Sequence, residues 1–148
     1  MIRVIGEVLT GLLGLRPPQL QVGALCVRRH KGKREVLLIS SLDTGRWIIP
    51  KGWPMNGRTL AGAAAQEAWE EAGVRGQVRP GHIGVFTYLK KRDSGMHLRC
   101  EVRVFQVEVQ SLSERYPEAG RRTREWFTCE EAAERVAEDG LKQILLGL

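Results

Sequence analysis

Three glutamates stand close together in an alanine-rich stretch: Glu67, Glu70 and Glu71. If the stretch is helical, offsets of three and four residues place all three carboxylates on nearly one face. Like charges at this spacing repel each other, and the dipole at the C-terminal half of a helix disfavours anions. A divalent cation relieves both effects, and oxygen-rich carboxylate sites suit Mg²⁺. The alternative is an acidic face that contacts only water, as on many surface helices.

The segment around these glutamates has the signals of a helix held between two loops. Thr59 is a suitable N-cap and Gly73 a suitable C-terminal stop, so we predict a helix over residues 59–72. Residues 50–54 (PKGWP) lead into it as a loop, because proline and glycine interrupt regular structure. This arrangement presents the three carboxylates beside exposed loop carbonyls, on a face that we expect to contact solvent.

The rest of the chain alternates β-rich and helical segments. No repeat or long linker divides it, so we expect an N-terminal arm or helix over residues 1–18 and a single domain over residues 19–148. Strands mixed with helices favour an α/β fold with helices on both faces of a sheet. Strands are predicted at residues 21–28, 35–41, 47–49, 84–90 and 98–109, followed by a loop to Trp126-Phe127 and helices at residues 130–138 and 141–146.

The composition is that of a globular domain with an excess of positive charge. The 148 residues are 43% hydrophobic and 27% charged, with a formal net charge of +6. That excess favours an anionic partner, which charge alone leaves open between nucleic acid, a membrane surface and a small polyphosphate. No apolar run reaches the roughly 18 residues of a membrane span. No aromatic–basic repeat indicates RNA binding. We therefore expect a small-molecule partner, and neither nucleic acid nor membrane.

Two further features bear on the cellular setting. The three cysteines are widely spaced, which indicates reduced thiols rather than a zinc site or a disulfide framework. Residues 1–15 are apolar but lack a cationic cluster and a cleavage site, so we expect no export and a cytoplasmic location. The same apolar arm allows a homodimer.

Residues 52–74 resemble the Nudix box, G-x5-E-x7-R-E-U-x-E-E-x-G-U, in which U is aliphatic. Two positions depart from it: Arg58 replaces a glutamate and Gln66 an arginine, two residues that commonly form a salt bridge in the family. Residues 25–28, 35–41, 46–50 and 124–127 add a likeness to the diphosphoinositol polyphosphate phosphohydrolases. The positions that match the box are Gly52, Glu67, Ala68, Glu70, Glu71, Gly73 and Val74.

The resemblance implies a fold, a reaction and a set of metal ligands. The fold is the Nudix α/β/α sandwich, with a mixed β-sheet and a loop–helix–loop catalytic motif. The reaction is Mg²⁺-dependent cleavage of a phosphoanhydride bond in diphosphoinositol polyphosphates or dinucleoside polyphosphates, with Mn²⁺ as a possible substitute. The metal ligands are Glu67, Glu70 and Glu71, with the carbonyl of Lys51 as a further ligand. Glu67 and Glu70 are catalytic, Glu70 as the general base, and Glu125 is an alternative base.

The resemblance also suggests which residues hold the substrate. Arginine can bind two phosphate oxygens at once, and lysine acts as a point charge. The branch's basic cluster before the first strand is replaced by residues 19–22 (QLQV), which weighs against an inositol pyrophosphate. ADP-ribose or nucleotide-sugar hydrolysis is the alternative reaction, and a non-catalytic nucleotide sensor is the alternative that Arg58 and Gln66 favour. The predicted substrate-binding residues are Ser41, Arg46, Lys91, Arg92, His97 and Arg122, while Gly52 and Gly73 have structural roles in the motif.

Overall fold

The computed structural model describes residues 17–148, and the predicted arm over residues 1–18 lies almost wholly outside them. None of the helices within the described part of the chain is long and apolar enough to cross a bilayer. The elements follow in the order β1 (Gln19–His30), β2 (Lys33–Ser40), β3 (Trp47–Ile48), β4 (Lys51–Gly52), α2 (Leu60–Ala72), β5 (Val74–Val78), β6 (Gly84–Lys91), β7 (His97–Leu112), β8 (Arg124–Thr128), α3 (Cys129–Arg135) and α4 (Asp139–Leu146).

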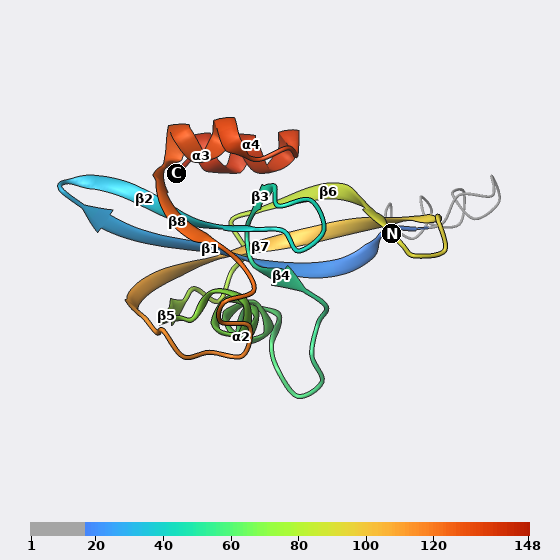
Figure 1. The fold of residues 1–148 in the computed structure, drawn as a ribbon, viewed down its shortest axis with the longest axis horizontal. Helices are drawn as coiled ribbons and strands as arrows, with labels where there is room; N and C mark the ends of the chain where they lie inside the picture. The colour runs from blue at the N-terminus through green and yellow to red at the C-terminus, as the bar shows by residue number, and fades with distance from the viewer. Residues whose placement is uncertain (1–16) are drawn as a thin grey trace.

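The strands form one mixed sheet around a central parallel pair. Its main path runs β3-β2-β1-β7-β5, with β4 beside β1, β6 beside β7 and β8 beside β2. Strands β1 and β7 are parallel, from Gln19 opposite Cys100 to Val27 opposite Glu108. The other pairs, including the β1–β2 and β6–β7 hairpins, are antiparallel. The predicted mixed sheet is therefore confirmed (Figure 1).

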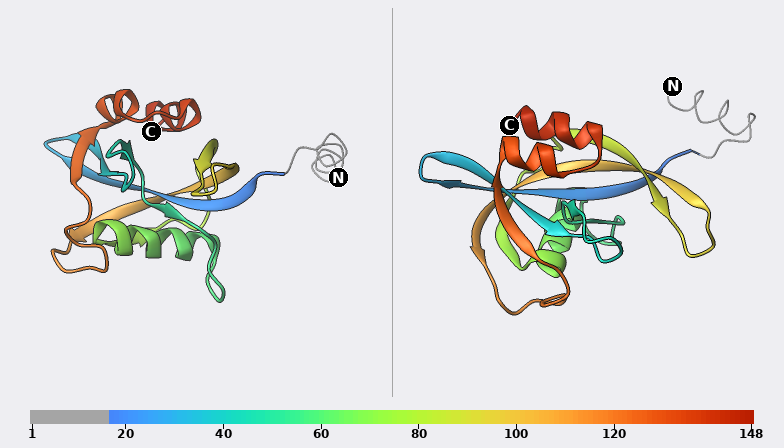
Figure 2. Two further views of the ribbon diagram at one scale, coloured as in Figure 1. Left: turned by 45° about the vertical axis from the view of Figure 1, so that its right-hand side comes forward. Right: turned by 45° about the horizontal axis from the view of Figure 1, so that its top comes forward.

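Helices cover both faces of this sheet. Helix α2 packs on one face, and α3 and α4 pack on the other (Figures 1 and 2). Side chains alternate along β1, so that Leu25 and Val27 join the core beneath α3 and α4, while Ala24 and Cys26 join the core beneath α2. A strand that is buried on both faces needs apolar residues at almost every position, which explains the apolar runs in the sequences of β1 and β2. The arrangement is the predicted α/β/α sandwich.

Helix α2 has both caps at the predicted residues, and it begins at Leu60, one residue after the predicted start. The Thr59 hydroxyl accepts a hydrogen bond from the Gly62 amide at 3.0 Å, which satisfies one of the free N–H groups of the first turn. Gly73 ends the helix with φ 68°, a left-handed conformation that glycine adopts without steric cost. Alanines Ala61, Ala64, Ala68 and Ala72 are buried on the sheet side. These small side chains allow the helix to lie close to the strands.

Three strands or strand ends differ from the prediction. Residues 74–78 form β5, which pairs with β7 across an irregularity between Arg75 and Gly76. Lys51 and Gly52, predicted to be loop, form the two-residue strand β4 against Gly23 and Val22 of β1. The predicted loop before Trp126 already belongs to β8, which starts at Arg124 and pairs with β2. In each case pairing with a strand elsewhere in the chain, and not the local sequence pattern, creates the strand.

The C-terminal helices are also displaced from their predicted bounds. Helix α3 starts at Cys129 after a capping box between Thr128 and Glu131, and it ends at Arg135. The prediction had extended it through Glu138. Glu138 instead stands at the N-cap position of α4, without a side-chain capping bond.

Candidate active site

A cleft of about 670 Å³ opens beside the C-terminal half of α2. Its walls come from the β2–β3 loop, β3, β4, the residue after β4, the end of β6 and the loop before β8. This volume is typical of a small-molecule site. The cleft collects eight of the residues predicted from the sequence: Ser41, Arg46, Lys51, Gly52, Glu67, Glu71, Lys91 and Arg122.

Four predicted site residues do not line the cleft. Glu70 lies on α2 with its side chain partly exposed, and its carbonyl accepts a hydrogen bond from the Glu118 amide at 3.0 Å. Arg92 and His97 are exposed in the β6–β7 hairpin. Gly73 lies at the helix end, packed against the loop after β7 through a bond from the Ser113 amide to its carbonyl.

Glu67 and Glu71 form the acidic part of the cleft. Glu71 is only 6% exposed, so the expectation that it faces solvent was wrong. Glu67 lies directly against Gly52, since a Cβ built on that glycine would stand 2.3 Å from the Glu67 Oε1. The two side chains interact as a hydrogen-bonded pair. The loop–helix–loop thus brings two carboxyl groups together against backbone that has no side chain.

The positive charge of Arg122 does not offset the cost of burying this pair. Burial, the hydrogen bond with Glu67 and the charges of Glu67 and Glu118 together raise the pKa of Glu71 to about 9, against the lowering effect of Arg122. Burial likewise raises the pKa of Glu67. Two carboxyl groups this close disfavour double ionisation, so the raised pKa values favour a form of the pair that keeps a proton. A bound cation would stabilise the form of the pair in which both carboxyl groups are ionised.

The donor set suits Mg²⁺ bound together with substrate and water. Across residues 17–148, no three His, Cys, Asp or Glu side chains are grouped so that they could hold a metal on their own. Mg²⁺ in phosphate chemistry is commonly bound by one or two carboxylates, with water and substrate phosphates completing its octahedron. Glu67 and Glu71 supply that pair of hard oxygen donors, and their proton is what a cation would replace.

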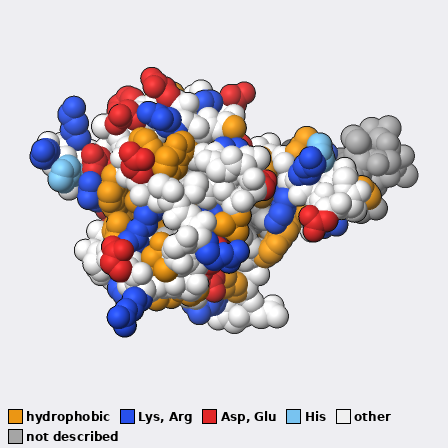
Figure 3. All heavy atoms as spheres, in the orientation of Figure 1, with side chains coloured by type: hydrophobic (Ala, Val, Ile, Leu, Met, Phe, Trp, Pro, Cys, Tyr) orange, Lys and Arg blue, Asp and Glu red, His pale blue; other side chains and the backbone are white. Residues whose placement is uncertain are grey.

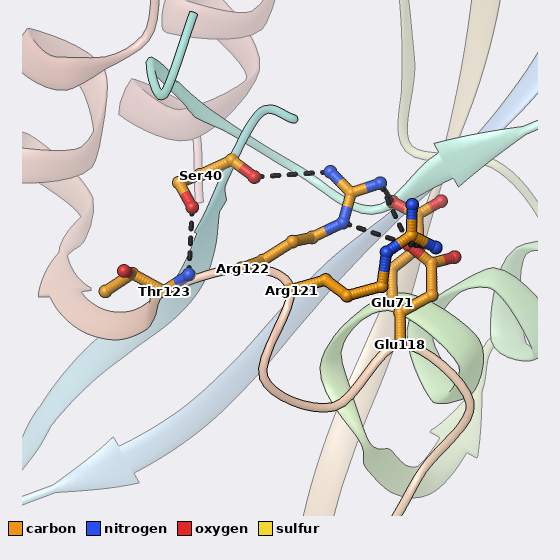
Figure 4. A network of polar contacts seen from close by, with 6 residues as sticks. All are labelled: Ser40, Glu71, Glu118, Arg121, Arg122 and Thr123. Carbon is orange, nitrogen blue, oxygen red and sulfur yellow. Dashed lines mark hydrogen bonds and ion pairs between the residues drawn. The ribbon is translucent and has the colours of Figure 1, made fainter. Parts of the chain in front are cut away.

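Arg122 holds the other side of the acidic pair through a network of polar contacts (Figure 4). Its guanidinium donates to the Glu118 carboxylate through Nε and Nη2, each at 3.2 Å, and to the Ser40 carbonyl at 3.2 Å. Its Nη2 also lies 3.6 Å from Oε1 of Glu71. The Arg122 side chain is 10% exposed. Its donors thus already have protein partners, and the predicted contact with phosphate stays a prediction.

We expect Arg122→Ala to destabilise the fold more than Arg121→Ala. The change removes the Arg122 donors from the Ser40 carbonyl and the Glu118 carboxylate and should lower the free energy of unfolding by about 1–3 kcal/mol. Arg121 is the matched control, because its side chain is 60% exposed and its ion pair with Glu118 spans 3.8 Å. Urea denaturation of both variants measures the difference. Equal midpoints would contradict a structural role for Arg122.

Cationic side chains also line the cleft. The Lys51 ammonium lies 4.9 Å from the centre of the Tyr88 ring, and burial lowers its pKa while the charges of Glu138 and Glu71 raise it. Arg46 donates to Oε1 of Glu138 at 2.8 Å, and the second oxygen of this carboxylate has no hydrogen-bond partner. Elsewhere, on the face seen in Figure 3, Lys and Arg side chains are scattered among acidic and apolar ones. The cleft therefore brings cationic side chains together with the Glu67–Glu71 pair.

Two acidic residues near the site were missed in the sequence. Glu118 comes from the loop between β7 and β8, and its charge raises the pKa of both Glu67 and Glu71. Glu138 comes from the start of α4 and binds Arg46 across 92 positions of the chain. Neither has a local pattern that marks it, because its partners are distant in sequence. No ion pair links Arg58 to residue 66 in the described part of the chain, consistent with the two changes in the box.

An α/β/α sandwich whose loop–helix–loop sets paired glutamates in a cation-lined cleft is the Nudix fold. The family model described as the NUDIX domain matches residues 17–146, and the chain belongs to this family. The resemblance inferred from the box is thereby confirmed.

Proteins with similar sequences belong to the same family. The chain is 34% identical over 109 residues to Nudix hydrolase 13, mitochondrial, of Arabidopsis thaliana, covering 70% of this chain and 54% of that protein. It is also 34% identical over 115 residues to diphosphoinositol polyphosphate phosphohydrolase 3-alpha of Mus musculus, covering 76% and 65%. The chain thus spans about half to two thirds of the length of these relatives.

Solved structures share the fold at low sequence identity. The Ap4A hydrolase of C. elegans superposes with a TM-score of 0.62 at 20% identity, over 88% of this chain and 95% of that chain. The NUDIX domain of Shewanella oneidensis NrtR, complexed with ADP ribose, superposes with a TM-score of 0.63 at 14% identity, over 93% and 94%. At these identities the likeness concerns the fold alone.

Proposed function

We propose that the protein is a Mg²⁺-dependent hydrolase that cleaves a phosphoanhydride bond in a small polyphosphorylated molecule. The observation that carries this proposal is the Glu67–Glu71 pair, whose burial raises the pKa of both carboxyl groups and which lines one cleft together with several cationic side chains. A structural role alone does not account for two carboxyl groups whose burial costs so much. The substrate classes are diphosphoinositol polyphosphates and dinucleoside polyphosphates, as the names of the relatives suggest.

Each part of the cleft has a role in this proposal. Glu67 and Glu71 hold Mg²⁺, with the carbonyl of Lys51 as a further ligand. When bound, Mg²⁺ neutralises charge on the diphosphate and lowers the pKa of a coordinated water. Lys51, Arg46 and Lys91 bind the phosphates that are not being cleaved. Ser41 is a further contact at the mouth, and Arg122 orients Glu71 and Glu118.

The identity of the general base is the part of the proposal that the cleft constrains least. Glu70 is our first choice and Glu125 the alternative, and neither side chain lines the cleft. Turnover by Glu70→Gln beside Glu125→Gln separates them, since removal of the base slows the chemical step typically 10²–10⁴-fold. The cytoplasmic location and the homodimer through the N-terminal arm also remain predictions.

We expect Mg²⁺-dependent product release from at least one of three substrates. These are a diphosphoinositol pentakisphosphate, diadenosine hexaphosphate and ADP-ribose, each assayed with Mg²⁺, with Mn²⁺ and with EDTA. The panel also tests the alternative reaction, because ADP-ribose hydrolysis alone would assign the protein to the ADP-ribose or nucleotide-sugar pyrophosphatases. Release that persists at full rate in EDTA would contradict the proposed role of the metal.

A nucleotide sensor is the second candidate, and the observation that favours it is the loss of the box salt bridge at Arg58 and Gln66. A sensor would bind ADP-ribose tightly without Mg²⁺ and release no product with it. The double reversion Arg58→Glu with Gln66→Arg is a direct check. Turnover that appears only in the reverted protein would support the sensor.

A further inference from the structure

The mouth of the cleft has an apolar rim. Seven large hydrophobic side chains are well exposed within residues 17–148, and three of them line this one cleft. They are Leu42, Trp53 and Leu89, exposed by 51%, 42% and 60%. They come from the β2–β3 loop, the loop after β4 and strand β6, so the clustering is created by the fold. Exposed apolar side chains that gather around a cleft are typical of a ligand-binding surface.

Trp53 stands beside the acidic and the basic parts of the cleft. It follows Gly52, which lies against the Glu67 carboxylate, and consecutive Cα atoms are only about 3.8 Å apart. The Lys90 ammonium lies 5.1 Å from the centre of its ring. A cation at this distance is attracted by the π-electrons and limits the motion of the ring. An aromatic surface is thus held next to the carboxyl pair and next to lysines.

The other tryptophans have different surroundings. Trp47 packs edge to face on Phe127 at 5.1 Å and joins the core beneath α3 and α4. Trp69 stacks with Arg75 and Trp126 with Arg28, and neither lines the cleft. Trp53 is therefore the tryptophan that a ligand in this cleft can reach.

The two substrate classes left open above differ in what they can place on this rim. An inositol polyphosphate is surrounded by phosphates and has no aromatic ring to stack on a tryptophan. A nucleoside polyphosphate has a flat base at one end of an anionic chain, and every base offers a π-face for stacking. Only the second class uses the apolar rim, the lysines and the carboxyl pair together.

We infer that Trp53, with Leu42 and Leu89, forms a base-binding subsite, and that the substrate is a nucleoside polyphosphate. Trp53 then acts as a specificity-determining residue. The base stacks on its ring while Lys90 and Lys91 bind the phosphates that lead to the carboxyl pair. The cleavage of that substrate rests on the proposed function, but the binding of the base does not.

Equilibrium binding tests the subsite without any turnover. The probes for calorimetry are α,β-methylene ADP and methylenediphosphonate, which share a non-hydrolysable diphosphate and differ by the nucleoside. We expect the wild-type protein to bind the nucleotide more tightly than the diphosphonate. Trp53→Ala should weaken nucleotide binding at least about tenfold, the effect of removing an aromatic that stacks on a base. It should leave diphosphonate binding unchanged, and Trp53→Phe should keep most of the nucleotide affinity.

The controls separate a local effect from a general one. Trp69→Phe removes part of a tryptophan outside the cleft and should bind both probes as the wild type does. Leu89→Ser tests the same subsite from a different strand, should Trp53→Ala lose its thermal transition. Equal affinity of the wild type for the two probes, or undiminished nucleotide binding by both Trp53→Ala and Leu89→Ser, overturns the inference. Binding that depends on Trp53 without hydrolysis of any substrate contradicts the proposed function and leaves the subsite standing.

Discussion

Glu71→Gln is expected to abolish Mg²⁺-dependent hydrolysis while the protein stays folded. Glutamine has the shape of the protonated acid but cannot donate a full negative charge to a cation. The loss of metal-based charge stabilisation is worth several kcal/mol, which corresponds to a fall in turnover of at least about a hundredfold. Steady-state assays at saturating Mg²⁺ measure this fall. Near wild-type turnover would rule out Glu71 as a metal ligand.

The same change should make the protein more stable at alkaline pH when divalent cations are removed. The pKa of Glu71 in the folded protein, about 9, lies above its ordinary value of 4.5. Its contribution to stability is therefore complete below pH 4.5 and is lost as the pH rises toward 9, by up to about 1.4 kcal/mol per pH unit. Glutamine has no such loss, because it does not titrate.

Thermal unfolding in EDTA between pH 5 and pH 9 tests this second effect. The melting temperature of the wild type should fall more steeply over this range than that of Glu71→Gln, and added Mg²⁺ should raise only the wild-type curve at pH 8. Glu134→Gln on the exposed surface of α3 is the matched control, and should follow the wild type. Parallel curves for wild type and Glu71→Gln would mean that the buried carboxyl group costs nothing on ionisation.

Gly52→Ala should remove most of the activity without unfolding the protein. The added methyl carbon would stand 2.3 Å from Oε1 and 2.4 Å from Cδ of Glu67, so the carboxylate has to move. The end of a flexible side chain can give way, which keeps the change in stability within about 1 kcal/mol. The shift of a catalytic group by about 1 Å can lower turnover about a hundredfold.

Gly81→Ala is the control for this substitution. Gly81 has no heavy atom within 4 Å of a built Cβ, so the added methyl group meets open space. Its turnover and melting temperature should equal those of the wild type. Full activity in Gly52→Ala would show that the position of Glu67 does not limit the reaction, and a large fall in melting temperature would show that Gly52 is required for folding.

Local signals predicted the parts of the fold that depend on local structure. The Thr59 cap and the Gly73 stop define α2 because each acts within one helical turn. The apolar runs of β1 and β2 predict strands, and both faces of these strands are buried. Strands β4 and β5 could not be predicted in this way, because their few residues are ordered by pairing with β1 and β7.

The site was predictable to the same extent. The spacing of Glu67 and Glu71 places them on one side of a helix, but the sheet and Arg122 that bury Glu71 come from elsewhere in the chain. For the same reason Arg122 looked free to bind phosphate, although Glu118 and Ser40 already accept its hydrogen bonds. Residue types identified the chemistry, and only tertiary contacts decide which charges remain available for a ligand.

The parallel pairing of β1 with β7 has a consequence for how the protein folds. Its partners, from Gln19 with Cys100 to Val27 with Glu108, are 81 positions apart, whereas the two hairpins close within a few residues. Contacts of such high contact order form slowly, because a long loop loses its entropy before the pairing is made. Helix α2 packs across both strands, through Ala24 of β1 and Phe105 of β7. During synthesis on the ribosome, α2 can therefore pack against both strands only after β7 has emerged, and the cleft is complete only when Arg122 has followed.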